Sequence, residues 1–284
     1  MTSVTTGQQI ERVTRLQDAA YRIRSHALDM GEVQGQGYIG QALGVADVLA
    51  VAYCDQLRFR PAEPHWPERD RFLLSIGHYA IALYAALAES GVIEEGELQT
   101  YGSDESRLPM SGMASYTPGM EISGGSLGHG LGVANGMALG LRHLGNPARV
   151  FNLLSDGELD EGSTWEAALV AAHHELDNVT AIVDVNALQA DGATELVLST
   201  EPITDKWRAF GWYALRVDGN DIRALVAAFD ELAEHRGSPK VLICDTRVGR
   251  GAPTLENREK AHFMRVEEHE WQIARDQLKE GQRR

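Results

Sequence analysis

Short apolar runs of the kind that forms buried strands recur through the chain, and helical patterns separate most of them. The runs are RFLLSIGH (71–78), RVFNLL (149–154), VTAIVDV (179–185), WYALRV (212–217) and KVLICDT (240–246). None of them shows the strict alternation of polar and apolar residues that marks a sheet with one wet face. Strands that alternate with helices favour an α/β fold, a mostly parallel sheet with helices on both faces.

Helical periodicity fills most of the intervening chain. It predicts helices over 8–30, 45–54, 79–91, 124–145, 162–174, 203–210 and 222–235, with a charged helix at the end. The glycine-rich stretch 31–44 is predicted to be a loop. The stretch RVGRGAPTLENREKAHF (247–263) is a second predicted loop, and loops beyond about 12 to 15 residues are uncommon unless functional. No convincing linker interrupts the chain, so a single domain over 1–284 is expected.

Charge and hydropathy exclude several classes of function. A net charge of −15 disfavours nucleic acid as a partner, because an acidic chain repels a phosphate backbone. No apolar run approaches the roughly 18 to 20 residues of a membrane span, and the N-terminus lacks the pattern of a secretory signal. We therefore expect a cytoplasmic protein without membrane partners. Cys54 and Cys244 have no partners at metal-ligand spacing and are predicted to be buried small hydrophobes.

Two polar side chains follow neighbouring predicted strands at the point where each strand ends. Asp156 comes after the run 149–154, and Asn186 follows 179–185. Ligands of parallel sheets bind outside the carboxyl ends of the strands, so the two side chains are expected at one crevice. A carboxylate, an amide oxygen and a backbone carbonyl are hard ligands that suit Mg²⁺ or Ca²⁺, and Gly157 lets the backbone approach a ligand. Taken alone, an Asp-Gly pair is more typical of a simple turn.

The surroundings of this pair resemble a known family. SDGELDEG with its later DVN is similar to the thiamine diphosphate signature, and further runs resemble transketolases in particular. These runs are IR (23–24), GVADVLAVAY (44–53), RDRFLLSIGH (69–78), ALYAALAESG (82–91), TPGMEISGGSLGHGLGVANGMALG (117–140) and ENREKAH (256–262). Their shared order covers nearly the whole chain. The resemblance implies the diphosphate-binding fold of these enzymes, with thiamine diphosphate and Mg²⁺ or Ca²⁺ as cofactors.

The resemblance also implies roles for residues at the diphosphate end of the cofactor. Asp156 and Asn186 would coordinate the metal through their side chains, and the carbonyl of Leu188 would add a backbone ligand. Gly157 would lie against the diphosphate, and Glu158 beside it counts among the cofactor-binding residues.

Other implied positions lie towards the reacting end. His78 and His262 would reach the cofactor or its phosphates and are expected to be catalytic. Gly125 and Leu127 match the loop that lines the aminopyrimidine. Glu161 matches an acidic residue that links the two active sites of the family dimer, and it is the third expected catalytic residue.

Two positions depart from the family where its histidines face the substrate. Tyr38 stands in place of one histidine and Ser111 in place of the other, while Ser155 replaces the first glycine of the signature. Histidine titrates near neutral pH, whereas tyrosine and serine do not. We therefore expect an altered donor or acceptor.

The length of the chain, beside the longer family members, suggests a two-component enzyme. We expect the N-terminal subunit of a split transketolase, which assembles as α2β2 and is active only with a separately encoded partner chain. Its reaction would transfer a two-carbon ketol or related acyl unit from a ketose-like donor to an aldehyde acceptor. The alternatives are the alpha subunit of a 2-oxo-acid dehydrogenase and a non-catalytic homologue. A dinucleotide-binding domain is disfavoured, because no Gly-x-Gly-x-x-Gly turn follows the first strand.

Overall fold

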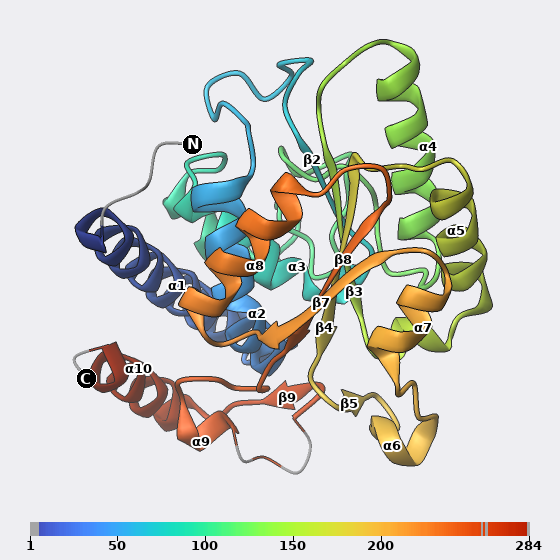
Figure 1. Cartoon of the computed structure of the whole chain (residues 1–284). Helices are drawn as coiled ribbons and strands as arrows, with labels where there is room; N and C mark the ends of the chain where they lie inside the picture. Colours follow the sequence, from blue (N-terminus) through green and yellow to red (C-terminus); the bar gives the residue numbers. More distant parts are fainter. Residues whose placement is uncertain (1–5, 257, 259–260, 283–284) are drawn as a thin grey trace.

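A computed structural model of the chain describes residues 6–256, 258 and 261–282, and a five-stranded parallel sheet lies at its centre (Figure 1). In spatial order the strands are β2 (Arg71–Leu74), β3 (Val150–Ser155), β4 (Val179–Val185), β8 (Lys240–Asp245) and β7 (Tyr213–Asp218). The predicted parallel sheet is therefore confirmed, with four of its strands within one residue of the expected bounds. β2 is shorter than predicted and ends at Leu74.

Helices cover both faces of the sheet, as predicted (Figure 1). One face carries α1 (Thr6–Gln34), α2 (Ile39–Val51), α3 (Ala80–Glu89), α8 (Ile222–Glu234) and α10 (Glu268–Gln282). The other carries α4 (Gly130–His143), α5 (Gly162–His173) and α7 (Ile203–Ala209). Successive side chains of β3 enter opposite cores, Phe151 and Leu153 on one face and Val150 and Leu154 on the other. Because both faces are buried, the strands need no polar positions.

Short elements connect these layers. They are π-helical Ala52–Gln56, the 3-10 turns Gly77–Tyr79, Glu95–Thr100 and Gly157–Asp160, and the small helices α6 (Thr194–Val197) and α9 (Pro253–Glu256). Two antiparallel ribbons pair β1 (Gln36–Gly37) with β9 (Met264–Arg265), and β5 (Leu188–Gln189) with β6 (Gly192–Ala193). The predicted loop 247–263 therefore contains one helical turn, and Asn257, Glu259 and Lys260 of its ENREKAH run lie outside the described residues.

The glycine-rich stretch 31–44 is mostly helical, so its prediction as a loop was wrong. α1 continues to Gln34 and α2 already begins at Ile39. Two of the glycines sit in α2 because another segment passes against the helix. A Cβ on Gly40 would lie 2.5 Å from the side chain of Val248, and one on Gly44 would lie 2.8 Å from the carbonyl oxygen of Arg247. These glycines allow close packing, and a sequence pattern does not distinguish that use from a loop.

The predicted helix over 124–145 begins six residues late, at Gly130. Residues 124–129 instead form a loop against the carboxyl end of β2. A Cβ on Gly124 would lie 2.1 Å from the carbonyl oxygen of Leu74, so only glycine fits this approach. Cys244 is buried as predicted, whereas Cys54 is half-buried. Within the described residues, no helix is both long and apolar enough to cross a membrane.

Candidate active site

Asp156 and Asn186 lie at the carboxyl ends of two adjacent strands, as expected. β3 and β4 run parallel, with Ser155 opposite Asp184. The backbone N–H of Asp156 donates to the carbonyl of Asp184 at 2.9 Å, and the Asp156 carboxylate accepts from the N–H of Ala187 at 3.0 Å. The sheet therefore brings the predicted metal ligands to one edge.

A tight turn after β4 orients the other predicted ligands. Ala187 has a φ of 60°, in the left-handed region that non-glycine residues seldom adopt. The N–H of Leu188 donates to Oδ1 of Asn186 at 3.0 Å. The strained residue thus gives its own N–H to Asp156 while the next one holds the amide oxygen of Asn186.

The Asp156 carboxylate is only 2% exposed, and burial raises its pKa to about 6. Hydrogen bonds from the Thr194 hydroxyl at 2.9 Å and the Gly157 N–H at 2.9 Å oppose this rise. No group of three or more His, Cys, Asp or Glu side chains in the described part of the chain could hold a metal. The predicted set instead combines one carboxylate with amide and carbonyl oxygens, and such hard oxygen donors fit Mg²⁺. A cation here would compensate a buried charge that the protein leaves poorly solvated.

A buried hydrogen-bond network that sequence reasoning missed fixes Asn186. Its Nδ2 donates to the Tyr79 hydroxyl at 2.7 Å and to Oδ2 of Asp184 at 2.8 Å. The Tyr79 hydroxyl donates to the same oxygen at 2.8 Å, and the Thr246 hydroxyl donates to Oδ1. Burial raises the pKa of Asp184, which is 1% exposed. An acidic residue inside the apolar run VTAIVDV was the available signal.

The structure brings together the predicted catalytic histidines and one altered position. The rings of His78 and His262 lie 5.8 Å apart between centroids. The Tyr38 ring contacts both, at 4.6 Å from His78 and 5.4 Å from His262, and it also meets the half-exposed Phe263 at 5.2 Å. Phe263 was not predicted, and no sequence signal singled it out.

The surroundings lower the pKa of both histidines and so favour the neutral imidazole. Burial, and then the neighbouring His262, lowers the pKa of His78 to about 4. Burial also lowers the pKa of His262, while the Leu188 backbone acts as a hydrogen-bond partner that raises it. Nε2 of Gln41 lies 3.2 Å from Nδ1 of His262. If that amide donates to Nδ1, the ring carries its proton on Nε2 and can donate a hydrogen bond from there.

The glycine-rich loop places the predicted residues Gly125 and Leu127 beside the end of β2. The N–H of Gly125 donates to the Ser75 carbonyl at 2.8 Å, and its φ of 113° demands glycine. A Cβ on Gly125 would meet Oγ of the exposed Ser111 at 3.6 Å, so the second altered position lies against this loop. Leu127 is half-buried and packs on the core.

The two glutamates of the signature differ in environment. Glu158 is fully buried, and this burial raises its pKa to about 7 against the opposing bonds from Ser75 and Gly128. Glu161 precedes α5 and is exposed. It lies beside the glycine-rich loop, since a Cβ on Gly128 would be 2.8 Å from the Cβ of Glu161. No ring contact or hydrogen bond joins Glu161 to the histidine pair in the described residues.

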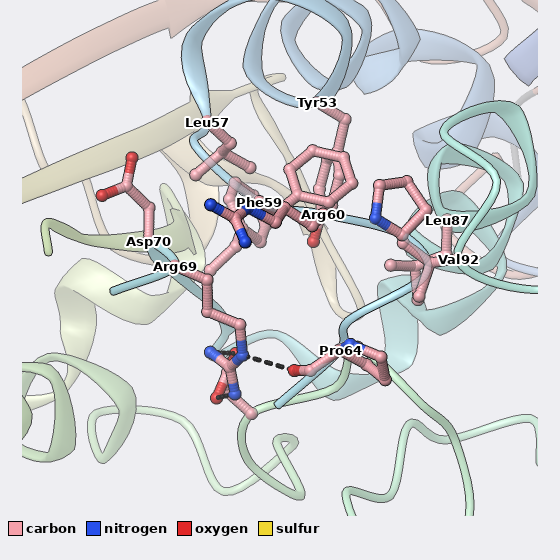
Figure 2. A pocket seen from close by; sticks show the side chains of 13 residues that line it. Tyr53, Leu57, Phe59, Arg60, Pro64, Arg69, Asp70, Leu87 and Val92 are labelled. Carbon is pink, nitrogen blue, oxygen red and sulfur yellow. Dashed lines mark hydrogen bonds and ion pairs between the residues drawn. The ribbon is translucent and has the colours of Figure 1, made fainter. Parts of the chain in front are cut away.

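An apolar hollow shown in Figure 2 is separate from this site. Tyr53, Phe59 and Arg69 line it, and Nε of Arg69 donates to the Pro64 carbonyl at 2.6 Å. It includes Asp70, which precedes the amino end of β2, and none of the predicted site residues. Its volume of about 40 Å³ admits only a few water molecules, so it cannot accommodate a coenzyme.

Comparison with known proteins gives matches over nearly the whole chain. The family model described as the transketolase thiamine diphosphate binding domain matches residues 16–281. A transketolase family protein of Sinorhizobium fredii is 63% identical over 264 residues, which cover 93% of this chain and 95% of the relative. The 6-deoxy-6-sulfo-D-fructose transketolase subunit of a Clostridium species is 38% identical over 96% of this chain and 98% of its own length. An apulose-4-phosphate transketolase subunit of Actinobacillus succinogenes is 39% identical over 86% and 88%.

Solved transketolases share the fold. The enzyme of Campylobacter jejuni superposes with a TM-score of 0.86 at 30% identity, over 93% of this chain and 42% of its own. The enzyme of Leishmania mexicana gives a TM-score of 0.84 at 26% identity, over 94% and 45%. The chain thus spans less than half of each solved enzyme. The family match also favours transketolase over the dehydrogenase subunit considered from the sequence. This chain belongs to the transketolase family, and its sheet and surrounding helices form the thiamine diphosphate binding domain of that family.

Proposed function

We propose that this chain is the diphosphate- and Mg²⁺-binding subunit of a two-component transketolase. It would transfer a two-carbon ketol, or a related acyl unit, between a ketose-like donor and an aldehyde acceptor. The observation that carries the proposal is its alignment with 98% of a relative named as a transketolase subunit, together with the grouping of Asp156 and Asn186 at one sheet edge. A cytoplasmic location and the absence of nucleic-acid or membrane partners stay predictions.

The residues would divide the work at the cofactor. Thiamine diphosphate supplies the carbanion chemistry of the reaction when it is bound. Asp156, Asn186 and the Leu188 carbonyl would hold Mg²⁺, and Gly157 and the neighbouring backbone would approach the diphosphate. Gly125 and Leu127 would line the aminopyrimidine.

The histidine pair would contact the substrate or the phosphates as neutral groups. The lowered pKa values of His78 and His262 leave each imidazole one N–H donor and one acceptor nitrogen near pH 7. Such rings can hold hydroxyl groups and relay a proton without carrying a fixed charge. Tyr38, in contact with both, would present a phenol where a further histidine is expected.

The altered positions support a substrate pair other than xylulose 5-phosphate and ribose 5-phosphate. Two relatives are named for 6-deoxy-6-sulfo-D-fructose and for apulose 4-phosphate. We propose that this chain also acts on a ketose donor with an anionic group. Tyr38 and Ser111 would make hydrogen bonds to this donor where other family members use histidines. The exposed ring of Phe263 beside Tyr38 would add an apolar surface on the side from which the substrate reaches the histidine pair.

α4 and α5 lie side by side on one face of the sheet (Figure 1), and their exposed small and apolar residues support the proposed α2β2 assembly. Gly132, Gly136 and Gly140 recur at four-residue spacing, with nothing within 4 Å of a Cβ built on any of them. Val133 and Leu169 nearby are 41% and 57% exposed. A helix surface of small and apolar residues allows another helix to approach closely, and we propose that another subunit covers it. The exposed Glu161 at the start of α5 would face this interface.

Reconstitution tests the proposal. The chain is purified alone, and again after coexpression with a chain that carries the pyrimidine-binding half of a transketolase from the same genome. We expect ketol transfer only from the pair, and only with thiamine diphosphate and Mg²⁺. The donors compared are xylulose 5-phosphate, apulose 4-phosphate and 6-deoxy-6-sulfo-D-fructose. Full turnover by the chain alone would refute the two-component proposal, and efficient use of xylulose 5-phosphate with ribose 5-phosphate would refute the altered substrate.

A further inference from the structure

We propose that Glu158 is a positioning residue that fastens the glycine-rich loop 124–130 to the end of β2 and does not itself touch the cofactor. The inference rests on the proposed function in one respect, because the fastened loop is the one expected to line the aminopyrimidine. It assigns Glu158 a role different from that of a direct cofactor ligand.

The contacts of Glu158 gather the amides of one loop. Its Oε1 accepts from the N–H of Gly128 at 2.8 Å and from the hydroxyl of Ser75. Oγ of Ser75 in turn accepts from the N–H of Gly130 at 3.1 Å, and the Ser75 carbonyl accepts from Gly125 at 2.8 Å. Three N–H groups of a single loop therefore end on the pair formed by Glu158 and Ser75.

The same glutamate belongs to the turn that carries the predicted metal ligand. Its N–H lies 3.3 Å from Oγ of Ser155, and its carbonyl accepts from the Thr164 hydroxyl at 3.1 Å. Both bonds fix the turn Gly157–Asp160, which begins directly after Asp156. The Glu158 side chain thus sets the distance between the predicted metal site and the predicted aminopyrimidine loop.

Burial argues against direct contact with a ligand. Glu158 is 0% exposed. Its Oε2 has no hydrogen-bond partner in the described part of the chain, and neither has the side chain of the equally buried Asn152. A Cβ on Gly130 would lie 2.8 Å from Oδ1 of Asn152, so this second polar group also borders the loop. Burying a carboxylate with one unpaired oxygen destabilises the fold. The hydrogen bonds that its other oxygen accepts from Gly128 and Ser75 are therefore the contribution that Glu158 makes at this place.

Three variants separate a fastening role from a contact role. Glu158→Gln keeps an acceptor oxygen and removes the charge, whereas Glu158→Leu removes the acceptor. Ser75→Ala removes the hydroxyl that bonds to both Glu158 and Gly130, and it keeps the test possible if Glu158→Leu fails to fold. Glu166→Gln, an exposed glutamate on α5, controls for a general loss of charge. Amide hydrogen exchange is measured on the full chain without cofactor, in peptides covering 122–131 and, for comparison, β7. The affinity for thiamine diphosphate with Mg²⁺ is measured by calorimetry.

We expect exchange in 122–131 to become about tenfold faster in Glu158→Leu and Ser75→Ala, with β7 unchanged, because each loses hydrogen bonds of the loop. Cofactor affinity should fall about tenfold in the same two variants and change less than about threefold in Glu158→Gln and Glu166→Gln. The inference is overturned if Glu158→Gln weakens cofactor binding as much as Glu158→Leu, or if loop exchange is unchanged in Ser75→Ala. Failure of the wild-type chain to bind thiamine diphosphate would instead refute the proposed function, while the exchange data still judge the fastening role.

Discussion

Replacing Asp156 with asparagine should stabilise the isolated chain near neutral pH and abolish its response to Mg²⁺. Burial raises the pKa of this carboxyl from 3.8 to about 6. A pKa unit corresponds to about 1.4 kcal/mol, so keeping Asp156 ionised at neutral pH costs the fold about 3 kcal/mol. The amide is neutral and avoids this cost.

The substitution also loses something. Asparagine offers one acceptor oxygen where the carboxylate accepts from Gly157, Ala187 and Thr194, and an N–H left without a partner costs roughly 1 to 2 kcal/mol. The net gain is therefore about 1 to 2 kcal/mol, equivalent to a rise in melting temperature of roughly 2 to 6 °C for a chain of this size.

The sign of the pH dependence provides the sharpest check. Because folding raises this pKa, the stability contributed by Asp156 is complete below its unfolded value and is lost as pH rises through about 6. The gap between Asp156→Asn and wild type should be present at about pH 7.5 and vanish near about pH 4.5. Calorimetric melting with and without Mg²⁺ and thiamine diphosphate measures both effects, with the exposed Asp104→Asn as control. A variant that melts no higher than wild type at the upper pH, or whose gap persists at the lower, would refute the reasoning.

Three further results are expected. His78 should stay neutral above about pH 5.5, because its pKa is lowered to about 4, so its ring proton shifts in NMR should not change up to about pH 8, and stability should fall as pH drops below about 6.5. Gly124→Ala places a Cβ 2.1 Å from the Leu74 carbonyl and should lower the unfolding free energy in urea by about 3 kcal/mol or more, whereas Gly132→Ala meets open space and should raise it by about 0.5 to 1 kcal/mol. In the reconstituted enzyme, Tyr38→His should raise kcat/KM for xylulose 5-phosphate about tenfold by restoring a hydrogen bond, and Tyr38→Phe should not.

The sheet and its metal-ligand edge were predictable because each depends on local pattern plus one topological rule. Apolar runs such as 179–185 identify buried strands whatever their neighbours are. Once strands and helices alternate, the carboxyl ends of adjacent strands must meet, and this rule alone brought Asp156 to Asn186.

The missed features depend on contacts between distant segments. Gly40 and Gly44 read as loop residues, since their tight fit to residues 247–248 follows from packing across some 200 residues of sequence. The start of α4 was placed too early because the pattern of small and apolar residues in α4 was extended back over residues 124–129, whereas Gly125 is held there by the Ser75 carbonyl after β2. The role of Asp184 needed Tyr79 and Thr246, which lie on either side of it in the chain.

The strand order has a consequence for the synthesis of the chain. β8 lies between β4 and β7 although it follows both in sequence, so a growing chain cannot join β7 to the rest of the sheet until residues 240–245 emerge. Until then one edge of β4 lacks its neighbour, and an unpaired apolar edge invites association with other chains. Ribosome-bound chains that end before Lys240 should therefore recruit chaperones or aggregate, whereas chains extended past the exit tunnel by a linker after Gln282 should resist protease.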